Sequence, residues 1–163
     1  MHSFSEVIAA LNDLRDRGIV NAYAIAGAMA ATFWDEAIPT FDLDVLIRLP
    51  GDDSTIVGLD AVYRWAADNG YTLNAEHIVI GDVPVQFLPA YNSLAEEAVQ
   101  KAKVLKYREL QVVVVSREYL IALALDPAAK TARRRERAAM LAESAALETA
   151  VLADIMRRYN LSW

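Results

Sequence analysis

The sequence predicts a mixed α/β (α+β) fold, in which helices pack against a small mixed β-sheet. Short apolar runs rich in β-branched residues alternate along the chain with longer amphipathic segments. With 55% hydrophobic and 23% charged residues, the 163-residue chain is long enough to bury a sizeable core. We expect one domain over residues 1–163, with about four or five strands in a core spanning about residues 20–116 and a helical part over about 117–163.

The first elements are set by an apolar stripe and three breaking residues. An amphipathic helix opens the chain and ends at Gly18. Residues 23–26 form a short apolar strand, which Gly27 ends. A short helix over residues 28–34 follows, and Pro39 prevents its continuation because proline lacks the backbone N–H.

A buried strand with a polar start is predicted for residues 42–49, where two acids alternate with apolar residues. A turn at residues 50–53 leads into a helix that ends at Asn69-Gly70. The apolar face of that helix consists of Ile56, Leu59, Val62, Tyr63 and Ala66.

The second half of the sheet is predicted from a hairpin and a valine run. Residues 71–80 and 83–88 flank a Gly-Asp pair, which is typical of a β-hairpin turn. Residues 94–102 form a helix, and residues 111–116 form a β-branched strand. Three helices complete the chain, over residues 117–125, 127 to about 140, and about 143 to 159.

Composition excludes several classes of function. The chain has no cysteine, which excludes disulfides and thiolate metal sites. Its net charge of −6 argues against a broad electrostatic surface for nucleic acid, although it allows a local basic patch. No apolar run reaches the length of a membrane span, so we expect no membrane partner and a cytoplasmic location.

The strongest candidate for a site is an acidic strand preceded by a glycine turn. Asp42 and Asp44 are two residues apart in a strand, so both carboxylates lie on one face about 7 Å apart. Two such like charges repel unless a cation lies between them, and carboxylate oxygens are suitable ligands for Mg²⁺. Upstream, Gly27-Ala28 opens a helix whose N-terminal N–H groups suit a triphosphate. The alternative is that the acids only orient the strand end, with Asp44 paired to an arginine such as Arg48.

These residues resemble the nucleotidyltransferase superfamily, which is marked by Gly-(Gly/Ser/Ala) at a helix start and a strand carrying Asp-x-Asp. The match comprises Gly27-Ala28 followed by Thr40-x-Asp42-x-Asp44. The residues of these segments are similar to those of the small bacterial branch related to abortive-infection (AbiEii-type) toxin nucleotidyltransferases. Residues 83–89 and 116–122 fit the same branch, so the resemblance covers about residues 22–140.

The resemblance implies Mg²⁺-dependent transfer of a nucleotide from a nucleoside triphosphate to an acceptor hydroxyl on RNA, protein or a small molecule. It implies that Asp42 and Asp44 are the catalytic metal ligands and that Gly27 and Ala28 contact phosphate. The hydroxyl of Thr40 would support the site. A role in a bacterial toxin–antitoxin system belongs to the same expectation.

Two positions depart from the family pattern. The family's third carboxylate matches Gln86, whose neutral amide supplies no charge and cannot act as a general base. Glu76 and Asp82 are the nearby alternatives. Late in the chain, relatives have lysine followed by aspartate, whereas this sequence has Lys130 followed by threonine. Lys130 and Arg133 lie where relatives have functional basic residues, so both are candidates for binding phosphate.

Several interpretations remain open. The Gln86 departure allows a non-catalytic relative that binds a nucleotide or a protein partner. The basic run over residues 130–137 binds phosphate or RNA, or is a solvated helix face. The apolar stripe of the final helix packs in the core, or contacts a protein partner or a second copy of the chain. His2 and His77 are too few for a histidine metal site, and His77 is expected at a surface or strand edge.

Overall fold

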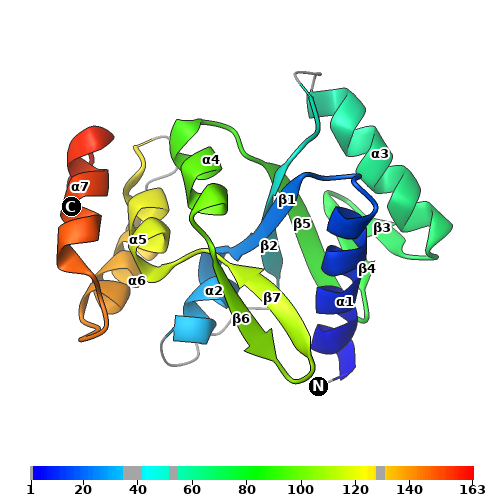
Figure 1. The fold of residues 1–163 in the computed structure, drawn as a ribbon, viewed down its shortest axis with the longest axis horizontal. Coiled ribbons are helices and arrows are strands. Elements are labelled where there is room, and N and C mark those ends of the chain that lie inside the picture. The colour runs from blue at the N-terminus through cyan, green and yellow to red at the C-terminus, as the bar shows by residue number, and fades with distance from the viewer. Residues whose placement is uncertain (1, 35–41, 52–54, 128–130) are drawn as a thin grey trace.

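The computed structural model describes residues 2–34, 42–51, 55–127 and 131–163 of the chain (Figure 1). The first half contains α1 (His2–Asp16), β1 (Ala22–Ala26), α2 (Gly27–Trp34), β2 (Leu43–Arg48), α3 (Thr55–Asp68), β3 (Thr72–Asn74) and β4 (His77–Ile80). The second half contains β5 (Val83–Pro89), α4 (Ser93–Gln100), β6 (Lys103–Tyr107), β7 (Leu110–Val114), α5 (Arg117–Leu125), α6 (Ala132–Ala142) and α7 (Thr149–Arg158). No helix in these ranges is long and apolar enough to cross a membrane.

The strands form one mixed sheet in the order β3-β4-β5-β2-β1-β7-β6. β1 pairs antiparallel with β2, whereas β2 with β5 and β1 with β7 are parallel pairs. The mixed α/β prediction is therefore confirmed. The described residues contain seven strands rather than four or five, because the predicted strand at 71–80 divides at a turn and β6 was not expected.

Both additional strands lie at the edges of the sheet, where sequence signals are weak. Ala75 has a positive φ of 56°, which turns the chain between β3 and β4, and all three residues of β3 are exposed. β6 carries Lys103 and Lys106, which lower its apolar content. Charged residues are typical of edge strands because they discourage pairing with other chains.

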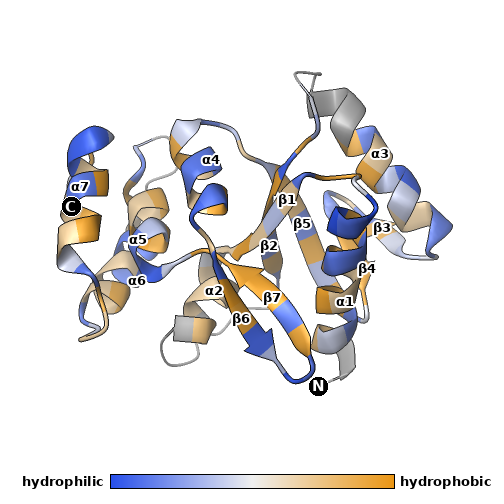
Figure 2. Cartoon of the chain, in the orientation of Figure 1, coloured by the Kyte–Doolittle hydropathy of each residue, from blue (hydrophilic) through white to orange (hydrophobic). Residues whose placement is uncertain are grey.

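Helices cover both faces of the sheet (Figure 1). One face packs against α1 and α3, where the Trp65 and Phe87 rings meet edge to face with centroids 6.4 Å apart. The other face packs against α2 and α4, and α5 packs against these two helices. The central strands are consequently apolar on both sides, whereas the helices carry their polar residues outward (Figure 2).

Hydrogen bonds fix α1 against the sheet. The buried Tyr23 hydroxyl donates to Asn12 Oδ1 at 2.7 Å and accepts from the backbone N–H of Val113 at 3.3 Å. The amide of Asn12 also donates to the carbonyl of Gln111 at 2.8 Å. Because these bonds join α1, β1 and β7, they hold the start of the chain in register with the sheet.

The last helices begin later than predicted. Thr131 caps α6 by accepting from the N–H of Arg134 at 3.2 Å, so the described helix begins at Ala132 rather than at Pro127. α7 begins at Thr149 rather than near Glu143. Apolar periodicity locates such helices, but the capping residue decides where each begins.

The carboxylate of Glu97 connects three helices by hydrogen bonds. Its carboxylate accepts two bonds from the guanidinium of Arg158, at 2.9 Å and 2.7 Å, and one from the Tyr119 hydroxyl at 2.5 Å. These bonds lower the pKa of Glu97 to about 2, and burial and Glu97 raise the pKa of Tyr119 to about 12. α4, α5 and α7 are thus connected through one carboxylate.

We predict that Glu97 makes the stability of the protein acid-sensitive. Because its folded pKa of about 2 is below the ordinary value of 4.5, its contribution is present above pH 4.5 and is lost as the pH falls toward 2. Glu97→Gln should lower the free energy of unfolding at pH 7 by about 1–3 kcal/mol. The difference from wild type should shrink between pH 4.5 and 2, as measured by urea denaturation.

Glu96→Gln is the matched control, because Glu96 is an exposed neighbour on the same helix. It should leave the pH dependence as in wild type. Equal pH profiles for wild type and Glu97→Gln would contradict the prediction.

Candidate functional site

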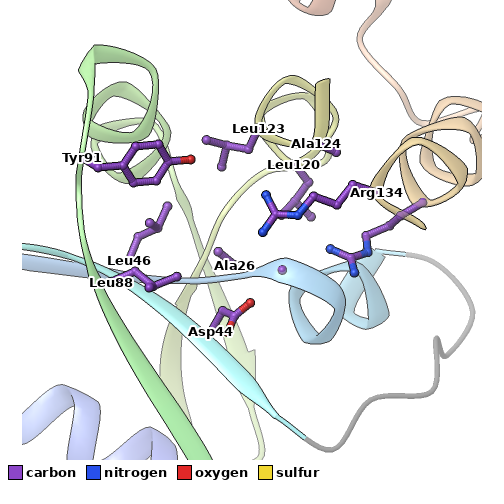
Figure 3. A pocket seen from close by; sticks show the side chains of 11 residues that line it. Ala26, Asp44, Leu46, Leu88, Tyr91, Leu120, Leu123, Ala124 and Arg134 are labelled. Carbon is purple, nitrogen blue, oxygen red and sulfur yellow. The ribbon is translucent and has the colours of Figure 1, made fainter. Parts of the chain in front are cut away.

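A cavity of about 220 Å³ opens between the sheet and the helices α5 and α6 (Figure 3). Asp44 and Arg134 point into it from opposite walls. The lining residues are Ala26, Gly27, Asp44, Leu46, Leu88, Tyr91, Leu120, Leu123, Ala124, Arg134 and Arg137. The predicted residues Gly27 and Asp44 therefore lie in one cavity.

Strand pairing places Asp44 in the middle of the sheet. It lies opposite Ala26 of β1 in the antiparallel pair and beside Gln86 of β5 in the parallel pair. The three side chains consequently share one face of the sheet, the face on which the cavity opens. The small Ala26 leaves room above Asp44, and Gln86 is half-buried outside the cavity lining.

Gly27 joins β1 directly to α2 and has a positive φ of 64°. A Cβ atom at this position would lie 2.6 Å from Asp44 Oδ2, which is closer than real Cβ contacts. Backbone conformation and space therefore both require glycine here. The first residue of α2 is consequently brought next to the Asp44 carboxylate. Ala28 follows in the first turn of α2 and is half-buried outside the cavity lining.

The environment of Asp44 raises its pKa. Burial is the main cause, because the half-buried carboxylate loses water. The guanidinium groups of Arg134 and Arg137 act in the opposite direction, and the nearby carboxylate of Asp42 adds to the rise. A cation bound beside Asp44 would therefore stabilise the ionised form of this partly buried carboxylate.

Two arginines of α6 supply positive charge to the same cavity. Arg134 and Arg137 are half-buried, and neither forms an ion pair with a described residue. Burial lowers the pKa of Arg137, and Arg134 lowers it further by repulsion. Arg133 is exposed on the same helix and does not line the cavity. The described cations that line the cavity are therefore Arg134 and Arg137, and a phosphate contact at Arg133 stays a prediction.

His77 is closer to the acidic strand than the sequence suggested. Its Nε2 lies 3.9 Å from Asp42 Oδ2, and its side chain is only 20% exposed. The reason is strand register: Ile78 pairs with Val85, so His77 comes next to Gln86. The expectation of a surface or edge side chain is corrected. A lone histidine gives no sequence signal for such a contact, because the contact depends on the pairing of β4 with β5.

The donor set suits a metal that takes part of its coordination from a substrate. Asp42 and Asp44 offer carboxylate oxygens, and Gln86, whose side chain carries an amide oxygen, pairs with Asp44 in the next strand. Within the described ranges, no three acidic or histidine side chains are grouped to hold a metal by themselves. Glu76 is 63% exposed beside His77, and Asp82 is exposed in the hairpin turn. Mg²⁺ commonly binds through one or two carboxylates plus phosphates and water, so the residues fit it.

Two predicted site residues, Thr40 and Lys130, lie outside the described residues. Their hypothesised contacts with the site stay predictions.

Comparison with known proteins identifies the fold. No family model and no curated protein sequence matches the chain. The solution structure of the antibiotic-resistance factor ANT(2'')-Ia is similar, with 18% identity, 98% of this chain and 95% of that one covered, and a TM-score of 0.50. The crystal structure of an antigenic nucleotidyltransferase-like protein from Paracoccidioides brasiliensis covers 98% of this chain and 89% of its own at 15% identity, with a TM-score of 0.54.

These likenesses show the fold: the chain has a nucleotidyltransferase-like fold, as its resemblance to the superfamily predicted. The abortive-infection branch stays a prediction. Activity at the cavity is a separate matter, because one fold carries many functions.

We predict that the space at Gly27 is needed for both stability and site geometry. Gly27→Ala should destabilise the protein by about 1–3 kcal/mol more than Gly70→Ala in chemical denaturation. Gly70 is the matched control because its φ is +76° and nothing lies within 4 Å of an added Cβ. It therefore incurs the backbone strain alone.

Truncation of Asp44 should relieve the contact. In the double variant Gly27→Ala with Asp44→Ala, the added cost of the Gly27 change should fall toward that of Gly70→Ala. Strictly additive effects would show that the close approach does not limit this site.

Proposed function

We propose that the protein transfers a nucleotide from a nucleoside triphosphate to an acceptor hydroxyl, with Mg²⁺ bound at Asp42 and Asp44. The observation that carries the proposal is that Asp44, the N-terminus of α2 and two arginines meet in one cavity. Neither arginine forms an ion pair with a residue that the structure describes. A carboxylate for a metal and cations for phosphate are both needed to bind a metal–triphosphate complex.

The cationic wall is suited to the phosphates. Arg134 and Arg137 repel each other, and a polyphosphate between them would remove that repulsion. The first N–H groups of α2 lack partners within the helix and point toward negative charge. Gly27 allows this approach because it adds no side chain between α2 and Asp44.

The acidic strand is suited to the metal. When bound, Mg²⁺ would neutralise charge on the phosphates and orient them for in-line attack. Asp44, which lines the cavity, and the exposed Asp42 two residues before it would hold the ion. In the reaction, a bond forms between the acceptor oxygen and the α-phosphorus. The bond to the β-phosphate oxygen breaks, and pyrophosphate leaves with that electron pair.

A second candidate function is binding without turnover. Gln86 lies beside Asp44 and cannot accept the acceptor's proton, which favours a nucleotide- or partner-binding module. We also propose, from the sequence resemblance, the abortive-infection type, a toxin–antitoxin role in bacteria, and RNA, protein or a small molecule as acceptor.

We predict that Mg²⁺ with a nucleoside triphosphate raises the melting temperature. At a ligand concentration of 100 Kd the gain is about 2.7 kcal/mol, which corresponds to several degrees for a chain of this size. Asp42→Asn with Asp44→Asn should abolish the metal-dependent part of the shift in a thermal-shift assay. If no triphosphate shifts the wild type, nucleotide transfer and nucleotide binding both fail, and only the partner-binding form of the second candidate stands.

A turnover assay then separates the two functions. Triphosphate labelled at the α-phosphate should leave label on RNA, protein or small-molecule acceptors and release pyrophosphate. A thermal shift without any transfer of label supports the binding module.

We predict that the two cavity arginines, and not their exposed neighbours, bind the phosphates. Arg134→Ala and Arg137→Met should each weaken triphosphate binding about tenfold or more, because each loses a charge-assisted contact. Arg133→Ala and Arg135→Ala are matched controls on exposed positions of α6. Isothermal titration calorimetry gives the affinities, and equal losses at all four positions would contradict this assignment.

A further inference from the structure

The cavity has two chemically different ends, and the proposed function uses only one. Its charged end consists of Gly27, Asp44, Arg134 and Arg137. The apolar lining residues are Leu46, Leu88, Tyr91, Leu120, Leu123 and Ala124, of which Leu120 and Ala124 lie beside Arg134 (Figure 3). Figure 3 shows Tyr91, Leu46 and Leu88 together on the side of the cavity away from Arg134. These three side chains form the apolar end of the cavity, to which the proposed function assigns no part of the ligand.

Strand register sets the distance between the two ends. Leu46 pairs with Leu88 in the next row along the sheet after Asp44 and Gln86. Two residues along a strand advance about 7 Å, so the apolar row begins about 7 Å from the acidic row on the same face. A ligand that is anionic at one end and apolar at the other matches this order.

Tyr91 is held at the apolar end by its neighbours in the chain. The N–H of Ala90 donates to the carbonyl of Ile47 at 2.9 Å, which extends the pairing of β5 with β2. The side chain of Asn92 donates to Asp126 at 3.0 Å and accepts from Ala95 at 2.8 Å. Tyr91 lies between these two fixed points and is 53% exposed.

The hydroxyl of Tyr91 lies near charged groups. Burial raises its pKa and the charge of Asp126 adds to the rise, whereas Arg134 lowers it. Figure 3 shows the ring of Tyr91 on the same side of the cavity as Leu46 and Leu88, with its hydroxyl directed toward the side of Arg134. A ring of this kind, apolar on its face and polar at its tip, is well suited to another aromatic ring.

We propose that the apolar end binds the nucleobase of the triphosphate, by contact with Tyr91 and the leucines, without reading the identity of the base. This inference rests on the proposed function. Selection among bases needs donors and acceptors directed at the base edge. Among the described residues of this end, the Tyr91 hydroxyl is the one side-chain hydrogen-bonding group. The base therefore adds affinity, and its edge adds little selectivity.

The test compares ligands by isothermal titration calorimetry with Mg²⁺ present. The probes are non-hydrolysable analogues of ATP, GTP, CTP and UTP, together with inorganic tripolyphosphate. We expect all four analogues to bind about tenfold or more tightly than tripolyphosphate, since stacking of one base contributes a factor of this size. The two purines should differ from each other by less than about threefold.

Variants assign the gain to Tyr91. Tyr91→Ala should reduce the affinity for each nucleotide about tenfold and change that for tripolyphosphate less than twofold, whereas Tyr91→Phe should keep most of it. Trp163→Ala is the matched control, because Trp163 is equally exposed and does not line the cavity. Melting temperatures without ligand establish that each variant is folded.

The outcomes separate this inference from the function on which it rests. If tripolyphosphate binds as tightly as the nucleotides, or Tyr91→Ala leaves nucleotide affinity unchanged, the base lies elsewhere and the inference is overturned while the phosphate site stands. A preference for one purine above about tenfold also overturns it. If neither tripolyphosphate nor any nucleotide binds, the proposed function itself is wrong.

Discussion

The close approach of Gly27 to Asp44 is the constraint on which the candidate site depends. Pairing of β1 with β2 places Ala26 opposite Asp44, and the chain must then enter α2 at the next residue. Only a residue without a Cβ leaves the Asp44 carboxylate in place, because the added atom would lie 2.6 Å from Oδ2. The helix N-terminus and the carboxylate are therefore neighbours by construction of the backbone. The remaining groups of the cavity are arranged around this pair.

The charges of the cavity are held by packing that lies outside it. Asp44 and Arg137 are both partly desolvated, so each costs free energy in the ligand-free protein. Strand pairing holds Asp44 in place. The position of Arg137 is maintained because α5 packs against α6, and α5 is in turn joined to α4 and α7 through Glu97. The hydrogen-bonded carboxylate of Glu97 thus supports the helices behind Arg134 and Arg137, neither of which forms an ion pair with a described residue. A rigid support beside a site with partly desolvated charges is typical of binding sites.

The fold and the centre of the site could be predicted from the sequence because both depend on local patterns. Strand and helix periods gave the mixed fold, and the glycine turn with its acidic strand gave Gly27 and Asp44. Arg134 and Arg137 belong to the basic run predicted over residues 130–137, yet their position in the cavity depends on how α6 docks through Ala138 and Leu141. The contact of His77 with Asp42 depends on strand register, which no local pattern fixes. β6 was missed because its lysines mask an edge strand.

In the function that we propose, binding and turnover depend on different residues of the site, and Gln86 separates them. A carboxylate at this position would lie beside the desolvated Asp44 and raise its pKa further. The neutral amide avoids that repulsion, so Asp44 stays more readily ionised and available to a cation. The same amide cannot take the proton of an acceptor hydroxyl. The arrangement therefore favours binding of a metal–nucleotide complex whether or not a reaction follows, and catalysis requires that the proton leave by way of solvent or the substrate itself.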